Sequence, residues 1–212
     1  VKAIIKEMNL DTDIYKPKQI RNRISSFKNS LITVQAYHNN PELLEADREA
    51  RRSGMGNIYR NYVERCFKAG AMDFDDLLLK TNELLNRFPD ILAKYQDRFR
   101  YILVDEYQDT NHSQYLIVRA LADKFQNLCV VGDDAQSIYA FRGANIENIL
   151  NFNKDYPDAK TYRLEQNYRS TEHIVDAANS VIQHNQNKLE KTVWTANEKG
   201  EKIVIHRSPS DG

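Results

Sequence analysis

The fold of this chain is decided by one stretch of sequence, Tyr101-Ile102-Leu103-Val104-Asp105-Glu106-Tyr107-Gln108-Asp109-Thr110. Its first four residues are apolar and suit a β-strand, and two adjacent carboxylates follow where that strand would emerge into solvent. A nucleoside-triphosphatase needs two acids at such a position, one for Mg²⁺ and one to orient the attacking water. Acids also end strands simply because they are solvated. However, the polar residues after Glu106 need partners, which an ATP site would supply.

Such a site also needs a phosphate-binding loop, Gly-x-x-x-x-Gly-Lys-Ser/Thr, and this pattern occurs nowhere in the chain. Val1 is not an initiator methionine, and Ile4, Ile5 and Met8 already follow a helical pattern. We therefore expect an internal piece of a longer protein, without the phosphate-binding half of the site.

Composition narrows the possible partners. The 212 residues are enough for one large domain or two small ones. The 30 basic and 30 acidic residues cancel, so nucleic-acid contacts would have to come from local patches or stacking side chains. Cys66 and Cys129 lie in apolar patterns, which predicts buried reduced thiols and a cytoplasmic location. No apolar run approaches the ~18 residues of a membrane span, so we expect no membrane association.

About the first 97 residues follow a helical pattern. Ile20, Ile24 and Phe27 recur at helical spacing after Pro17, and residues 58–67 form a second apolar face closed by Gly70. Asp73 is placed to cap a third helix. The segment from Lys16 to Lys28 carries five basic residues and no acid. It could bind phosphates, but a solvated helix face is the favoured interpretation.

The pattern then changes to short apolar runs at residues 101–104 and 128–131, typical of strands buried on both faces. A helical stretch lies between them, so the order predicts a βαβ unit with a parallel sheet. Asp105-Glu106 follows the first run and Gly132-Asp133-Asp134 follows the second. Because ligands of parallel sheets bind at the carboxyl ends of the strands, both loops should face one site.

A third region begins near Gln166. Apolar residues at helical spacing predict a helix over residues 174–182, with Ser170 or Thr171 as its cap. Residues 202–207 are predicted to form another strand.

The loop after the second strand carries further candidate residues. Gln136 is an uncharged donor and acceptor that could contact a phosphate oxygen. Tyr139, Phe141 and Arg142 offer two flat rings and a guanidinium, which suit stacking on unpaired bases. The alternative, favoured by composition alone, is that the two rings are core aromatics in a loop.

The segment Gln166-Asn167-Tyr168-Arg169-Ser170 precedes the predicted third-region helix. Arg169 could act as an arginine finger on a γ-phosphate, and Tyr168 could stack on a purine. Taken alone, Arg169 is better read as an ordinary surface arginine.

Together, three motifs closely resemble those of the superfamily 1 DNA helicases of the UvrD, PcrA and Rep group. Asp-Glu-x-Gln-Asp from Asp105 is similar to helicase motif II, and Gly-Asp-x-x-Gln-Ser-Ile-Tyr-x-Phe-Arg-Gly-Ala from Gly132 to motif III. Gln-Asn-Tyr-Arg-Ser from Gln166 is similar to motif IV. The resemblance extends over nearly the whole chain, including residues 72–78 and 191–195.

The resemblance implies a role for each candidate residue. Asp105 would hold Mg²⁺ and Glu106 would polarise the hydrolytic water. Gln136 would sense the γ-phosphate and couple it to DNA. Arg169 would reach the γ-phosphate from the second motor domain, and Tyr168 would stack on adenine.

For DNA binding, the resemblance implies that Tyr139 and Phe141 contact single-stranded DNA and that Arg142 belongs to the same motif. The family often has Trp where Phe141 stands, so we expect base stacking to persist but to be weaker.

The resemblance also implies a fold class: α/β, a partial RecA-like P-loop NTPase parallel sheet with a mainly helical insertion subdomain. Residues 1–99 would be the helical insertion of the first motor domain. Residues 100–165 would be the second half of that motor domain, and 166–212 the start of the second motor domain.

We therefore expect part of a bacterial ATP-dependent 3′-to-5′ DNA helicase that uses ATP and Mg²⁺, acts on single-stranded and partially duplex DNA, and is inactive as an isolated chain. Repair or replication proteins are possible partners. An unpaired sheet edge would favour dimerisation. The alternatives are part of a RecB- or AddA-type helicase-nuclease, and a module that binds DNA or protein without hydrolysis.

Overall fold

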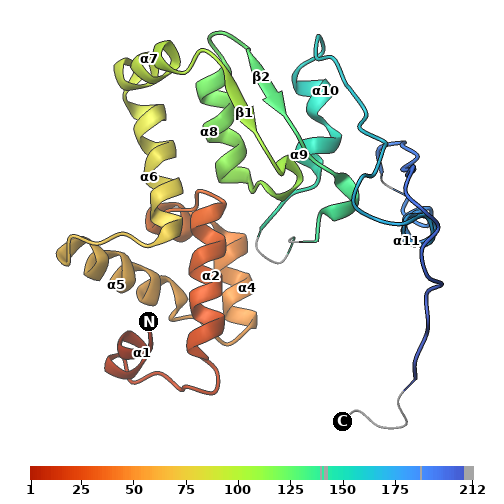
Figure 1. Cartoon of the computed structure of the whole chain (residues 1–212). Coiled ribbons are helices and arrows are strands. Elements are labelled where there is room, and N and C mark those ends of the chain that lie inside the picture. The colour runs from red at the N-terminus through yellow and green to blue at the C-terminus, as the bar shows by residue number, and fades with distance from the viewer. Residues whose placement is uncertain (139, 141–142, 187, 208–212) are drawn as a thin grey trace.

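The computed structural model describes residues 1–138, 140, 143–186 and 188–207 (Figure 1). Three parts follow one another along the chain: a helical part, a small parallel sheet with its helices, and a last helix followed by an extended segment (Figure 1). The mixed helix and strand architecture with a parallel sheet confirms the predicted fold class.

The predicted helical character of the first part is confirmed. Its helices are α1 (Lys2–Glu7), α2 (Pro17–Asn29), α3 (Val34–His38), α4 (Pro41–Glu49), α5 (Met55–Lys68), α6 (Phe74–Arg87) and α7 (Pro89–Arg98). Their core is a cluster of buried side chains: Ile4, Ile5, Tyr15, Ile20, Ile24, Phe27, Tyr37, Met55, Ile58 and Tyr59.

Sequence signals set several helix boundaries as predicted. Pro17 is the first residue of α2, and Gly70 adopts the left-handed conformation (φ +58°) just after α5. Asp73 caps α6 through a reciprocal capping box: the Asp76 N–H donates to Asp73 Oδ1 (2.7 Å), and the Asp73 N–H donates to Asp76 Oδ2 (3.2 Å).

Two expectations about this part are wrong in detail. Ile58 and Tyr59 are buried where α1 and α3 pack on α5, but Phe67, near the other end of that helix, is exposed. Lys28 is not on a solvated helix face. Its side chain is fully buried between Asp73 and Asp76, because it continues the inward-facing line of Ile20 and Ile24 at four-residue intervals.

The predicted βαβ unit is confirmed. Strands β1 (Ile102–Val104) and β2 (Leu128–Val130) run parallel, with Ile102 opposite Leu128 and Val104 opposite Val130. Helix α8 (His112–Ala122) connects them. It begins at Asn111, whose side chain forms a capping box with Gln114.

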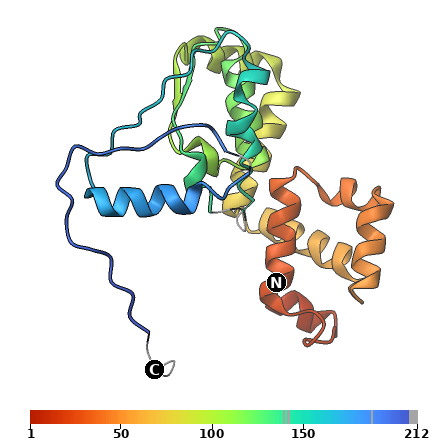
Figure 2. The ribbon, with the colours of Figure 1, turned by 90° about the vertical axis from the view of Figure 1, so that its right-hand side faces the viewer.

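The expectation that these strands are buried on both faces is wrong. Leu103 is 78% exposed and its neighbour Cys129 is also exposed, whereas Ile102, Val104, Leu128 and Val130 are half-buried. Figure 2 shows the neighbouring helices on one side of the strands. Within the residues that the structure describes, nothing covers the other face. For the same reason Cys129 is not the buried thiol that the sequence predicts, and Cys66 is only half-buried.

Short helices follow β2: α9 (Glu147–Leu150) and α10 (Phe152–Asp155). The last helix is α11 (Glu172–Ile182), with Thr171 at its N-cap position. Beside it, the Trp194 N–H donates to the Glu165 carbonyl (2.9 Å) and the Asn167 N–H donates to the Trp194 carbonyl (2.7 Å). The strand expected at residues 202–207 does not form. Val204 and Ile205 are exposed in an extended segment with no neighbouring strand among the described residues (Figure 1).

Candidate nucleotide site and nucleic-acid groove

The first acidic loop begins directly after β1. Asp105 and Glu106 are exposed, and the Glu106 N–H donates to Asp105 Oδ1 (2.9 Å). Glu106 lies in the left-handed region (φ +50°), which costs a residue with a side chain about 1–2 kcal/mol. The loop then turns into a short 3₁₀ helix, η1 (Tyr107–Asp109).

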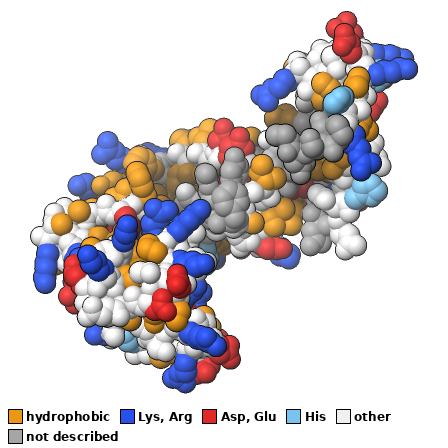
Figure 3. Space-filling model, turned by 90° about the horizontal axis from the view of Figure 1, so that it is seen from below, with side chains coloured by type: hydrophobic (Ala, Val, Ile, Leu, Met, Phe, Trp, Pro, Cys, Tyr) orange, Lys and Arg blue, Asp and Glu red, His pale blue; other side chains and the backbone are white. Residues whose placement is uncertain are grey.

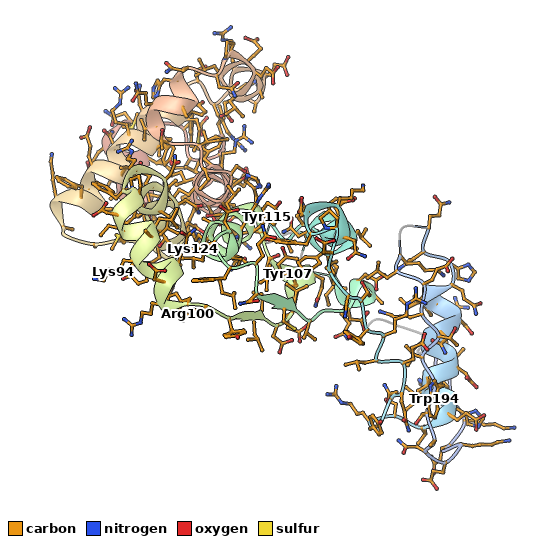
Figure 4. The ribbon with its side chains drawn as sticks, turned by 90° about the horizontal axis from the view of Figure 1, so that it is seen from above. Lys94, Arg100, Tyr107, Tyr115, Lys124 and Trp194 are labelled. Carbon is orange, nitrogen blue, oxygen red and sulfur yellow. The ribbon has the colours of Figure 1, made fainter. Side chains whose placement is uncertain are left out.

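Buried anchors behind Glu106 hold this backbone in place. The Tyr107 N–H donates to the Val131 carbonyl (2.9 Å), which ties the loop to the end of β2. The Tyr107 ring, labelled in Figure 4, is buried edge-on against Phe152 of α10 (ring centroids 5.7 Å apart). Asn148 of α9 donates to the Thr110 carbonyl and hydroxyl (both 3.0 Å). These buried contacts hold the backbone that directly follows Glu106, the residue in the left-handed conformation.

Gln108, to which the sequence assigned no role, connects the first acidic loop to the second. Its side chain is 1% exposed. Its Nε2 donates to Glu106 Oε2 (2.9 Å), and its Oε1 accepts the Asp133 N–H (3.0 Å). The expectation that a nucleotide supplies partners for the polar residues after Glu106 is wrong for Gln108, because the protein itself supplies them.

The second acidic loop leaves β2 through Gly132. A Cβ at this position would lie 2.6 Å from Gln108 Oε1 and 2.7 Å from Ile149 Cδ1, so the close packing requires glycine. The loop continues into a 3₁₀ helix, η2 (Asp134–Gln136), which the Asp133 carboxylate caps by accepting the Ala135 N–H (3.0 Å). Gln136 is exposed, and its Nε2 donates to Asp133 Oδ2 (2.9 Å).

Lys191, which lies 58 residues after Asp133 in the chain, forms ion pairs with this second loop. Its ammonium group bonds to Asp133 Oδ1 and to Asp134 Oδ1 (2.9 Å), and the Leu189 N–H donates to Asp134 Oδ2 (2.9 Å). Burial would raise the pKa of the Asp133 carboxyl, but hydrogen bonds from Lys191 and Gln136 outweigh burial and hold that pKa below its ordinary value. Burial would lower the pKa of Lys191, but its two carboxylate partners hold it above its ordinary value.

The segment before α11 approaches the second loop. A cavity of about 310 Å³ is lined by Asp133 and Gln136 of the second loop, by Asn167, Ser170 and Lys191, and by apolar residues of α11 such as Ile174 and Val175. Asn167 Oδ1 accepts the backbone N–H groups of Arg169 (2.9 Å) and Ser170 (2.8 Å), which shapes this turn. Arg169 and Tyr168 are both exposed and do not line the cavity. The Tyr168 hydroxyl donates to Gln166 Oε1 (2.9 Å).

The candidate DNA-stacking residues Tyr139, Phe141 and Arg142 lie outside the residues that the structure describes. Their neighbours Ala140 and Gly143 line a groove of about 950 Å³ whose opposite wall includes Lys18, Arg21 and Phe74. Phe74 is 89% exposed although it begins a helix. Phe74 is not among the candidate binding residues predicted from the sequence. Its position directly after the Asp73 helix cap was the signal from which its exposure could have been predicted. Figure 3 shows Lys and Arg side chains mixed with acids over the helical part.

Neither a preformed metal cluster nor a membrane span occurs in the described part of the chain. Among the described residues, no three histidine, cysteine, aspartate or glutamate side chains are grouped so that they could hold a metal ion. No helix that the structure describes is long and apolar enough to span a membrane.

Acidic loops follow both strands of the parallel sheet, and the mixed helix and strand architecture is that of a partial RecA-like α/β domain. Within that fold class, the chain belongs to the UvrD/REP helicase family. Residues 1–157 match the UvrD/REP helicase N-terminal domain, and residues 162–211 match the UvrD-like helicase C-terminal domain.

Similar curated proteins carry the name ATP-dependent DNA helicase PcrA. Those of Leuconostoc citreum and Bacillus subtilis (strain 168) are each 46% identical to this chain over 211 and 217 aligned residues, and that of Staphylococcus aureus (strain COL) is 47% identical over 214. Each comparison covers 100% of this chain. The chain spans 27–28% of the length of these relatives.

Proposed function

We propose that this chain is part of an ATP-dependent 3′-to-5′ DNA helicase, which couples ATP hydrolysis to movement along single-stranded DNA and to duplex unwinding. One observation carries the proposal: the Glu106 loop and the Asp133–Gln136 loop meet at the carboxyl end of a parallel sheet, joined through Gln108. That edge is where parallel sheets bind nucleotides. The names and identities of the relatives support the same activity.

In this proposal Asp105 holds Mg²⁺ and Glu106 orients the water that attacks the γ-phosphate. Bound Mg²⁺ would neutralise charge on the phosphates. In nucleotide sites this ion takes one or two carboxylates and completes its shell with phosphate oxygens and water. Asp105 is exposed and could supply one such carboxylate. Glu106, held by its support, would accept a hydrogen bond from the water.

The remaining nucleotide contacts would come from the second loop and the segment before α11. Gln136 would contact the γ-phosphate and Arg169 would stabilise its developing charge, while Tyr168 would stack on adenine. The cavity shared by Gln136, Asn167 and Ser170 supports the idea that these two segments act together.

DNA would bind in the groove that Ala140 and Gly143 line together with residues of the helical part. Lys18 and Arg21 supply positive charge there against one acid, Asp75, and Phe74 supplies an exposed ring. A basic groove with stacking rings is the usual way to bind a single strand without sequence preference. Tyr139, Phe141 and Arg142 are proposed to complete this surface.

We propose the domain division 1–99, 100–165 and 166–212. The change from helices to strands between α7 and β1 supports the first boundary, and the change of family match between residues 157 and 162 supports a second boundary close to 165. The unpaired thiols of Cys66 and Cys129 support a cytoplasmic location.

The exposed strand face and edge support dimerisation of the isolated chain. Repair or replication proteins are proposed as further partners. A monomer in light scattering at high protein concentration would contradict the dimer.

The proposal is tested by unwinding with the full-length protein that carries this chain. A duplex with a 3′ single-stranded tail should separate when ATP and Mg²⁺ are present, and the same duplex with a 5′ tail should not. Strands that come out shortened would indicate the helicase-nuclease alternative. DNA binding without ATP turnover would indicate the non-hydrolysing binding module. The isolated 212-residue chain should not hydrolyse ATP, since it lacks a phosphate-binding loop.

A further inference from the structure

We propose that Gln108 is a positioning residue that sets the Glu106 carboxylate according to the position of the loop after β2. The inference rests on the proposed function, in which Glu106 orients the hydrolytic water. Gln108 is 1% exposed, so it reaches neither solvent nor a ligand. It acts only through its two neighbours.

Both ends of the Gln108 amide are in use, and this fixes its orientation. The Nε2 end donates to Glu106 Oε2 (2.9 Å), and the Oε1 end accepts the Asp133 N–H (3.0 Å). A carboxylate in place of this amide could accept from Asp133 but could not donate to Glu106, and a thioether has no proton to donate and is only a weak acceptor. Only an amide of this length joins the two groups.

The space around Gln108 leaves little freedom for independent movement. Gly132 approaches so closely that a Cβ would lie 2.6 Å from Gln108 Oε1. The Gln108 carbonyl also accepts the hydroxyl of Ser137, which follows η2 (3.4 Å). A displacement of residues 132–137 would therefore shift the Gln108 amide, and with it the Glu106 carboxylate.

The loop is in turn held from the far end of the chain. Lys191 bonds to the Asp133 and Asp134 carboxylates, and the Leu189 N–H donates to Asp134. A continuous path thus runs from residues 189–191 through Asp133 and Gln108 to Glu106. Movement of the segment after α11 would be transmitted to the group that orients water.

The test measures steady-state ATP hydrolysis by the full-length protein in the presence of single-stranded DNA. Gln108→Met should lower kcat by about 10–100-fold, because small misplacements of a reacting group have effects of this size. The KM for ATP should stay within about twofold, since uniform binding is untouched. Gln108→Glu, which keeps the shape, should also lower kcat, and it decides the matter if Gln108→Met does not fold.

Gln96→Met is the matched control. The Gln96 side chain on α7 also donates an amide hydrogen bond to a distant residue, the Ala120 carbonyl of α8 (2.7 Å), but it lies away from the site. It should lose stability without losing kcat. The double variant Gln108→Met with Lys191→Met should have a kcat no lower than the poorer single variant, because both act on one path.

Three outcomes are informative. The expected pattern supports the inference. A kcat for both Gln108 variants equal to that of Gln96→Met, or losses that multiply in the double variant, would overturn it while leaving the proposed function intact. No DNA-stimulated hydrolysis by the unaltered full-length protein would overturn the proposed function itself, and the inference with it.

Discussion

Lys28, on α2, is a charged side chain with no access to solvent, and replacing it by methionine tests how α2 is held to α6. Its ammonium bonds to Asp73 Oδ2 (2.7 Å) and Asp76 Oδ1 (2.8 Å), and it lies 4.9 Å from the Tyr62 ring centroid. Methionine keeps the volume but removes the charge. Two carboxylates would then face each other around an apolar group.

The cost follows from these contacts. Each charge-assisted hydrogen bond contributes about 1.5–3 kcal/mol, and breaking a buried ion pair by removing one partner costs about 3–5 kcal/mol. We therefore expect Lys28→Met to lower the free energy of unfolding by about 3–5 kcal/mol. Urea titration followed by circular dichroism would measure this.

Lys80→Met is the matched control. Lys80 pairs with Glu83 on the surface of α6 at the same distance of 2.7 Å, but its side chain is 55% exposed. It should cost no more than about 0.5 kcal/mol. A loss for Lys28→Met below about 1 kcal/mol, the upper range for exposed pairs, or one equal to that of Lys80→Met, would refute the reasoning that burial makes this pair strong.

Three further predictions concern the site and the groove. The pKa of Asp73 and of Asp133 lies below the ordinary value of 3.8, so the stability they contribute is present above that value and is lost as the pH falls through the lowered pKa. The urea concentration at the unfolding midpoint should therefore fall when the pH is lowered below about 4, and it should fall less for Asp133→Asn. A urea midpoint that stays constant down to about pH 2 would contradict this. Gly132→Ala should lower the free energy of unfolding by about 1–3 kcal/mol through overpacking against Gln108, and an unchanged urea midpoint would contradict it. Phe74→Ala should leave stability unchanged but weaken single-stranded DNA binding by about 1–3 kcal/mol in fluorescence anisotropy. Phe67→Ala, similarly exposed on α5 outside the groove, should not weaken it.

The strands and acidic loops could be predicted from the sequence, because a short apolar run that ends in acids is typical of a strand that leaves a sheet through a polar loop. The helix starts at Pro17 and Asp73 were equally accessible, since they depend on local backbone chemistry. The burial of Lys28 could also have been found. It continues the four-residue spacing of Ile20 and Ile24, whereas the general rule for charge runs pointed to solvent.

The rest depends on contacts that no local pattern encodes. Gln108 and Lys191 meet their partners only after distant segments pack together, 25 and 58 residues away for their contacts with Asp133. The apolar spacing of residues 202–207 suits a strand, but a strand needs a neighbour to pair with. The exposure of Leu103 likewise reflects what packs on the sheet and not the strand itself.

In the proposed function, Glu106 orients the water in an ATP site whose other contacts come from Gln136 and Arg169. The most direct test is single-turnover ATP hydrolysis by the full-length protein with Glu106→Gln, beside Glu64→Gln as an exposed control on α5. We predict that Glu106→Gln still binds ATP and DNA but hydrolyses ATP about 10²–10⁴-fold more slowly, the usual loss when a group that handles the proton is removed. Hydrolysis at the rate of Glu64→Gln would contradict the claim.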